Sequence, residues 1–517
     1  MPAFDSPPSE AASYSRPSAS QAAADAIPVL IDDTYHIFHL STPPNTVHHP
    51  PRLRSSWSRL RSKDLVSWMR DPLPVLSPSS SESAPDADGA WTGSAVLGPD
   101  GTLHIFYTGY NLSQGGKQAI LHARSSDQHG TSFNADSEPI RIISPPLNLA
   151  AFEDIDFRDA YVFFNEEAGQ YWMLVATRLS SGPHWTRGCI ALLTSADLEE
   201  WSVEPAPLYA PNDMMCPECP ELFTLPNGKW YLVYSRFSAP NPGTVYRIAD
   251  SPRGPFRTPR DGSGGRFDAR RWYAAKSCQK AGDSSKRIFF GWIADFNEKD
   301  SRWLWGGSLA APRQVSARVD GSLEISPVEE VLHNKFSLLE GNENNRVAEE
   351  LNLRSIGQTL ATYLPILQKS VQSYVLEFSV SHHDALSFGV LLRTDDDLRG
   401  HRIRFEPAAD GSYAVSLLTD LPPLDDFWAD QYELYLPKNV DGPELARHSS
   451  VRLEETIRLV VENDTMELFV GGKSISYRIP PRLNSSETKE LGFFVEDGTF
   501  QPKQIRLYYK KHGRLGN

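Results

Sequence analysis

Short runs of apolar and polar residues, rich in aromatic side chains, recur along the first two thirds of the chain. Runs of this length between turn residues predict β-strands, and no stretch keeps the 3.6-residue period of a long amphipathic helix. Turn signals such as Pro99-Asp-Gly101 precede the runs, as expected in front of a hairpin strand. Similar aromatic segments start roughly 60 to 70 residues apart, at Tyr35, His104, Tyr171, Trp230 and Arg287.

A second repeat supports this period. Residues 62–68, Ser-Lys-Asp-Leu-Val-Ser-Trp, resemble residues 195–201, Ser-Ala-Asp-Leu-Glu-Glu-Trp. A unit of this length holds about four short strands, which is the size of one propeller blade. Five units therefore predict a five-bladed β-propeller over residues 25–327. The alternative is a pair of β-sandwiches in which the spacing is accidental.

The pattern changes after Pro327. Residues 328–340 are interpreted as a linker with a short helix, and residues 341–517 alternate apolar and polar positions, which predicts an antiparallel β-sandwich. Residues 1–24 are rich in Ser, Ala and Pro and lack the basic-then-apolar order of a secretory signal, so they are interpreted as a disordered tail. The predicted fold class is all-β, a five-bladed β-propeller followed by a C-terminal β-sandwich.

The charge balance argues against nucleic acid and anionic lipid as partners. The chain has 51 Lys and Arg against 65 Asp and Glu, a net charge of -14. No apolar run approaches the roughly 18 residues of a membrane helix. Cys216-x-x-Cys219 lacks the second ligand pair of a zinc site, so no metal is expected. Free cysteines and the missing signal predict an intracellular, cytoplasmic protein, with unconventional secretion left open. The oligomeric state is unknown from these features.

Acidic residues next to the first strand of a blade can converge, because those strands line the central channel. Glycosidic bond cleavage needs such a pair of carboxylates. Asp25 opens the first blade, Asp159 precedes the third repeat, and Glu218 precedes the fourth. Each has an alternative: Asp25 could end the tail, Asp159 could form only an ion pair with Arg158, and Glu221 could replace Glu218.

At these residues the sequence resembles glycoside hydrolase family 32, the invertase, inulinase and levanase family. Glu218-Cys-Pro-Glu221 is similar to that family's Glu-Cys-Pro-Asp block, and Phe157-Arg-Asp159 to its Arg-Asp-Pro block, with Ala160 in place of proline. The usual opening block, Trp-Met-Asn-Asp-Pro-Asn-Gly, is absent, and Asp25 stands at the matching distance. Further similar segments are Trp57 with residues 62–68, Trp91–Ser94, Trp272–Ala274, Gly291–Trp292 and Trp305–Gly307.

The resemblance implies a retaining, exo-acting hydrolase that releases fructose from β-fructofuranosides such as sucrose, inulin or levan. Glu218 would be the acid/base, Asp25 the nucleophile that forms a fructosyl-enzyme, and Asp159 the transition-state stabiliser. No metal and no organic cofactor are implied, and the partner is a small fructoside. The residues expected to bind substrate are Arg158, Trp57, Trp91, Ser94 and Tyr273.

Three alternatives remain open at this point. The same site could transfer fructose to a sugar acceptor or hydrolyse another furanoside. The missing opening block and the added sandwich would also suit a catalytically inactive sugar-binding protein. An inverting arabinan-type hydrolase would place its carboxyl groups farther apart, at roughly 6.5 to 9.5 Å, than the roughly 5 to 5.5 Å of a retaining enzyme.

Overall fold

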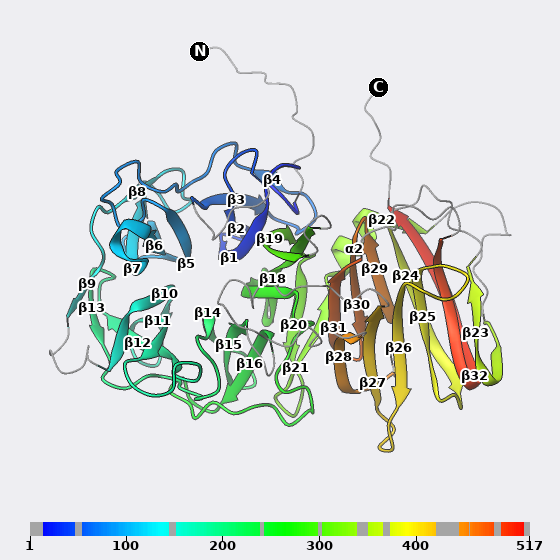
Figure 1. Ribbon diagram of the computed structural model, residues 1–517. Helices are drawn as coiled ribbons and strands as arrows, with labels where there is room; N and C mark the ends of the chain where they lie inside the picture. The colour runs from blue at the N-terminus through cyan, green and yellow to red at the C-terminus, as the bar shows by residue number, and fades with distance from the viewer. Residues whose placement is uncertain are drawn as a thin grey trace, which may run out of the picture. The chain divides into compact units, whose positions relative to one another are not determined.

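The computed structural model consists of two compact units. Unit 1 is Met1–Arg257, Tyr273–Ala294 and Leu304–Pro312, and unit 2 is Thr258–Trp272, Asp295–Trp303 and Arg313–Asn517. Both units are built almost entirely of β-strands (Figure 1). The structure describes residues 14–46, 54–143, 151–237, 242–297, 302–338, 350–364, 373–419, 444–453, 455–479 and 488–510.

Five blades of mainly antiparallel strands are grouped around a common centre in unit 1, which confirms the predicted five-bladed propeller (Figure 1). Blade 1 contains β1 (Ala23–Ile31), β2 (Thr34–Ser41), β3 (Ser56–Ser62) and β4 (Met69–Arg70). Blade 2 contains β5 (Gly89–Leu97), β6 (Leu103–Asn111), the 3-10 turn η1 (Leu112–Gln114), β7 (Lys117–Ser125) and β8 (Phe133–Ala135).

The other three blades follow one another in chain order. Blade 3 contains β9 (Arg141–Ile143), β10 (Phe152–Asn165), β11 (Gln170–Leu179), β12 (Gly188–Ser195) and β13 (Glu200–Val203). Blade 4 contains β14 (Glu218–Thr224), β15 (Trp230–Arg236) and β16 (Gly243–Ala249). Blade 5 contains β17 (Trp272–Lys280), β18 (Asp283–Asn297) and β19 (Arg302–Leu309), and β19 also pairs with β1.

The two similar heptapeptides, Ser62–Trp68 and Ser195–Trp201, form the same turn in blades 1 and 3. In each, the serine hydroxyl accepts a hydrogen bond from the backbone N–H of the leucine three residues later, at 2.9 Å. The tryptophan indole donates to the carbonyl of that leucine, at 3.0 Å in one copy and 3.2 Å in the other. The sequence echo therefore reflects a repeated structural unit, as the blade interpretation predicts.

Residues 14–24, part of the expected tail, contact the propeller. Residues 1–13 lie outside the described residues, but the Tyr14 hydroxyl donates to the Ala310 carbonyl at 3.0 Å. The backbone N–H of Leu309 donates to the Ser15 carbonyl at 2.9 Å. Tyr14 and the alanines before Asp25 thus find partners that low hydrophobicity alone did not indicate.

Unit 2 is a β-sandwich, which confirms the predicted C-terminal domain. The strand β32 (Lys489–Lys510) takes part in both of its layers, since its first half pairs with β25 (Ser387–Thr394) and its second half with β24 (Ser373–His383). The other elements are β20 (Arg313–Ala317), β21 (Leu323–Pro327), α2 (Glu329–Lys335), β22 (Phe336–Leu338), β23 (Leu353–Tyr363), β26 (His401–Pro407), β27 (Tyr413–Thr419), β28 (Glu444–Val451), β29 (Ile457–Glu462), β30 (Thr465–Val470) and β31 (Lys473–Arg478).

A buried arginine holds three segments of unit 2 together. Arg313 has no exposed surface, and its guanidinium donates to Asp268, to Glu467 at 2.9 Å and to the Ser474 hydroxyl at 3.0 Å. Replacing Arg313 by methionine should lower the free energy of unfolding by about 3 to 5 kcal/mol, because two buried carboxylates lose their partner.

Urea unfolding of the Arg313 variant measures this loss. The matched control is Arg354→Met at an exposed position of β23, which should change stability by less than about 0.5 kcal/mol. Equal stability of the two variants would contradict a structural role for the buried ion cluster.

Candidate active site

The three acidic residues lie where the inner strands of their blades are irregular. The antiparallel register shifts between Ala24 and Ala26 in β1, between Arg158 and Tyr161 in β10, and after Glu218 in β14. Positive φ angles accompany these shifts, 24° at Asp25, 59° at Asp159 and 50° at Cys219. Such bulges turn a side chain out of the regular alternation and are common beside active sites. They let acids from three blades share one region.

Asp25 is buried and is held by two side chains from other blades. Its Oδ2 accepts a hydrogen bond from the Thr92 hydroxyl, and its Oδ1 accepts one from the Trp292 indole N–H at 2.8 Å. Burial raises the pKa of Asp25 to about 6; the Thr92 hydrogen bond opposes this, and the negative charges of Asp159 and Glu218 add to it. The carboxyl is therefore oriented, and its ionisation falls within the mildly acidic range.

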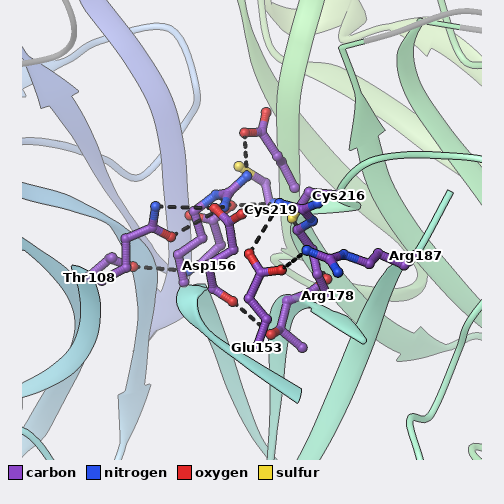
Figure 2. Close-up of polar contacts among 12 residues, drawn as sticks. Thr108, Glu153, Asp156, Arg178, Arg187, Cys216 and Cys219 are labelled. Carbon is purple, nitrogen blue, oxygen red and sulfur yellow. Dashed lines mark hydrogen bonds and ion pairs between the residues drawn. The ribbon is translucent and has the colours of Figure 1, made fainter. Parts of the chain in front are cut away.

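Asp159 is held by the backbone of Cys219 and by the Thr108 side chain, and Figure 2 labels both of these partners. Its Oδ2 accepts a hydrogen bond from the Cys219 backbone N–H at 2.9 Å, and its own backbone N–H donates to the Thr108 hydroxyl at 2.9 Å. Burial raises the pKa of Asp159, while the adjacent Arg158 guanidinium, with its Nε 3.8 Å from Oδ2, opposes the shift. The Glu218 carboxylate adds to it. The acid thus belongs to the same electrostatic cluster as Asp25.

Glu218 has a partner on each carboxyl oxygen. Arg158 Nη2 donates to Oε1 at 2.9 Å, and the Tyr273 hydroxyl donates to Oε2 at 2.7 Å. The other arm of the same guanidinium donates to Asp156 at 2.7 Å and to Gln118 at 3.2 Å. Two of the residues expected to bind substrate, Arg158 and Tyr273, therefore touch the predicted acid directly.

Glu221, the competing acid, is engaged elsewhere. It has no exposed surface, and Arg287 Nη2 donates to its Oε1 at 2.9 Å. Its carboxyl oxygens also accept hydrogen bonds from the backbone N–H and the hydroxyl of Ser277, at 2.9 and 2.6 Å. A carboxylate with all these donors is a structural anchor for blades 4 and 5, which favours Glu218 as the reacting acid.

The remaining three residues predicted to bind substrate are buried and contact other protein groups, as core residues do. The Ser94 hydroxyl accepts a hydrogen bond from the Val162 backbone N–H at 2.8 Å. Trp57 has no exposed surface and donates its indole N–H to the Trp91 carbonyl at 3.0 Å. Trp91 stacks on Tyr110 with ring centroids 4.0 Å apart. These contacts position the inner strand of blade 2.

Sequence reasoning missed the two residues that hold Asp25. Thr92 and Trp292 belong to segments noted only as similar to the family, between Trp91 and Ser94 and at Gly291–Trp292. Thr92 lies on β5, the first strand of blade 2, and Trp292 lies on β18, the second strand of blade 5. The signal that could have found them is their membership of the short segments that resemble the family.

Cys216 and Cys219 are both buried, and they contact the residues around the site through a thiol and a backbone N–H. The Cys216 thiol lies 4.0 Å from the Thr177 carbonyl, and the Cys219 backbone N–H donates to Asp159. Among the residues that the structure describes, no group of three or more His, Cys, Asp or Glu side chains is arranged to hold a metal ion. In the same part of the chain, no helix combines the length and apolar character needed to cross a membrane.

A family model and individual relatives of known name both match this chain. Residues 26–327 match the model of the N-terminal domain of glycosyl hydrolases family 32. The chain is 25% identical over 362 residues to β-fructofuranosidase, insoluble isoenzyme CWINV1, of Arabidopsis thaliana, covering 65% of this chain and 59% of that protein. It is 25% identical over 310 residues to fructan 6-exohydrolase of Beta vulgaris, covering 56% of this chain and 49% of that protein. The matches thus span about half of the relatives' length.

Solved structures share the fold. Fructan 1-exohydrolase IIa of Cichorium intybus superposes with a TM-score of 0.68 at 18% identity, covering 95% of each chain. Sucrose-6-phosphate hydrolase of Lactobacillus gasseri superposes with a TM-score of 0.67 at 20% identity, covering 95% of this chain and 91% of the other. A structure of the Cichorium enzyme is a complex with 1-kestose.

The expectation of an intracellular, cytoplasmic protein is wrong. The relatives include insoluble β-fructofuranosidase isoenzymes of Arabidopsis thaliana, which are extracellular cell-wall enzymes. All four cysteines are free and buried, and burial raises the pKa of the Cys189 thiol to about 12. A buried, protonated thiol resists oxidation in any compartment. The free cysteines therefore did not indicate a reducing compartment.

Proposed function

Because this chain belongs to glycosyl hydrolases family 32, we propose that it is a retaining, exo-acting β-fructofuranosidase. It would release fructose from sucrose or from inulin- or levan-type fructans. The observation that carries the proposal is the meeting of Asp25, Asp159 and Glu218 in one buried cluster built from three blades. The β-fructofuranosidase and fructan exohydrolase relatives support the choice of a fructoside.

In the first step, protonated Glu218 gives its proton to the glycosidic oxygen while Asp25 attacks the anomeric carbon of the fructosyl group. The bond from that carbon to the leaving oxygen breaks, and an ester bond to Asp25 forms. Thr92 and Trp292 orient the attacking carboxylate by their hydrogen bonds. The hydrogen bonds from Arg158 and Tyr273 orient Glu218.

In the second step, Glu218 acts as the base. It takes a proton from a water molecule, which attacks the anomeric carbon and releases fructose, while Asp25 recovers its carboxylate. Asp159 would accept hydrogen bonds from the fructose hydroxyls, because its carboxylate lies beside Asp25 and Cys219 in the same cluster. Charge-assisted bonds that strengthen as positive charge develops on the sugar favour the transition state over the ground state.

The pH dependence follows from the nucleophile. Asp25 must be ionised to attack, and burial raises its pKa to about 6, so kcat/KM should fall as the pH drops through about 6. Replacing Thr92 by valine removes a hydrogen bond that lowers this pKa, so the acidic limb should move to higher pH by about one unit.

A pH series of kcat/KM for sucrose measures both effects. Thr224→Val, at the exposed end of β14, is the matched control and should keep the wild-type profile. An acidic limb that stays in place, or moves to lower pH, in the Thr92 variant would contradict the assignment of this limb to Asp25.

Product analysis with sucrose, inulin and levan tests the function itself. The expected result is free fructose removed one unit at a time from the chain ends, without internal fragments. Longer oligosaccharides at high sucrose would identify a fructosyltransferase. Calorimetric binding of fructosides without any release of fructose would identify a binding protein and overturn the proposal.

A further inference from the structure

A series of alternating arginines and carboxylates leads from the partly exposed Arg187 to the buried Glu218. Figure 2 labels four of its members, Arg187, Glu153, Arg178 and Asp156. Each member contacts the next through a charged hydrogen bond, with N–O distances of 2.5 Å at the outer end and 2.9 Å at Glu218. The three inner distances are 3.1, 3.1 and 2.7 Å. From the outside inward, the series is Arg187, Glu153, Arg178, Asp156, Arg158 and Glu218.

Most of this series is shielded from water. The side chains of Arg158 and Arg178 are 4% exposed, and that of Asp156 is 16% exposed. Interactions between charges in such surroundings are screened far less than interactions at the surface. A change of charge at one member should therefore be felt by its neighbours along the series.

Asp156 is the member of this series that contacts the same arginine as Glu218. The Arg158 guanidinium donates from Nη1 to Asp156 and from Nη2 to Glu218, so these two carboxylates share its terminal nitrogens. A third carboxylate, that of Asp159, lies 3.8 Å from Arg158 Nε. The second oxygen of Asp156 in turn accepts a hydrogen bond from Arg178. The negative charge of Asp156 thus weakens the grip of Arg158 on ionised Glu218, and Arg178 moderates that negative charge.

We propose that Asp156 is a positioning residue that controls how readily Glu218 gives up its proton, by sharing the Arg158 guanidinium with it. The inference rests on the proposed role of Glu218 as the acid. Sharing keeps Glu218 from being locked as a carboxylate by an undivided arginine. Asp156 itself does not touch the substrate in this account and acts only through Arg158.

Because the charges alternate along the series, neutralising Asp156 and neutralising Arg178 should shift the basic limb of kcat/KM in opposite directions. Asp156→Asn removes a negative charge, so ionised Glu218 is favoured and the basic limb of kcat/KM should move to lower pH by about half to one unit. Arg178→Gln removes a positive charge and leaves Asp156 more negative, so the same limb should move to higher pH by a smaller amount. A purely structural role would lower activity in both variants without shifts of opposite sign.

The experiment compares pH profiles of kcat/KM for the full-length wild type and four variants. Asp156→Glu keeps the charge and should keep the wild-type limb. Asp154→Asn is the matched control, because that carboxyl is 84% exposed on the same strand and pairs only at 3.6 Å with Lys117, among the described residues. Unshifted limbs in Asp156→Asn and Arg178→Gln would overturn the inference. If Asp156→Asn does not fold, the sign of the Arg178→Gln shift decides.

A readout without turnover separates this inference from the proposed function. Difference infrared spectra of each variant against its Glu218→Gln counterpart report the titration of the Glu218 carboxyl, and the same opposite shifts are expected. If the wild type releases no fructose, the proposed function fails, while these titrations still decide the role of Asp156. Fructose release with identical titrations in all variants would remove the role of Asp156 alone.

Discussion

Glu218→Gln should lower kcat/KM for sucrose by about three to four orders of magnitude, because the amide can neither donate the proton to the leaving oxygen nor take one from water. The fold should persist. Glutamine has the same shape, and its carbonyl can still accept the hydrogen bond from Arg158, which is 2.9 Å away in the wild type. Steady-state kinetics together with thermal unfolding measure both outcomes.

Two comparisons sharpen this prediction. Glu166→Gln, at an exposed turn of blade 3, should retain full activity. Azide should restore part of the turnover of Glu218→Gln on a fructoside with a good leaving group, since the anion attacks the fructosyl-enzyme without needing a base. Activity close to that of the wild type in Glu218→Gln would remove this residue from the mechanism.

Asp25→Asn should abolish fructose release and at the same time stabilise the fold. The amide cannot form the fructosyl ester, so the expected loss of kcat is about four orders of magnitude or more. Burial raises the pKa of Asp25 to about 6, above its ordinary value of about 4, so the ionised carboxylate destabilises the native state. The free energy of unfolding at pH 7 should therefore rise by about 1 to 3 kcal/mol in the variant.

The sign of this effect depends on pH. Below about pH 4 the carboxyl is protonated in both folded and unfolded chains, so wild type and variant should be equally stable there. The wild type should lose stability relative to the variant as the pH rises through about 4 to 6. Urea unfolding at several pH values measures this, with Asp32→Asn in an exposed turn as the control. A variant that is less stable at pH 7 would contradict the account.

The blades could be predicted from the sequence because each is a local set of hairpins. Aromatic strands at regular intervals, and the shared turn of Ser62–Trp68 and Ser195–Trp201, depend on contacts between residues close together in the chain. The same holds for the period-two strands of the sandwich. Such patterns survive substantial sequence divergence, since they need only residue types and not particular partners.

The environment of the acids could not be predicted in the same way. Asp25 depends on Thr92 from blade 2 and Trp292 from blade 5, which are far away in the sequence. The bulges that orient Asp159 and Cys219 arise from pairing with neighbouring strands, and no residue type specifies them. Their positions at the starts of blades and the resemblance to a family indicated these acids. Neither signal revealed the sharing of Arg158 between Glu218 and Asp156.

The central claim, double displacement at Asp25 with Glu218 as the acid/base, is tested most directly by trapping the intermediate. Glu218→Gln is mixed with a fructoside that has a good leaving group, and the quenched protein is digested and examined by mass spectrometry. The account predicts one hexosyl group in ester linkage on the peptide that contains Asp25. A hexosyl group on another residue, or fructose released with inverted configuration and no adduct, would contradict it.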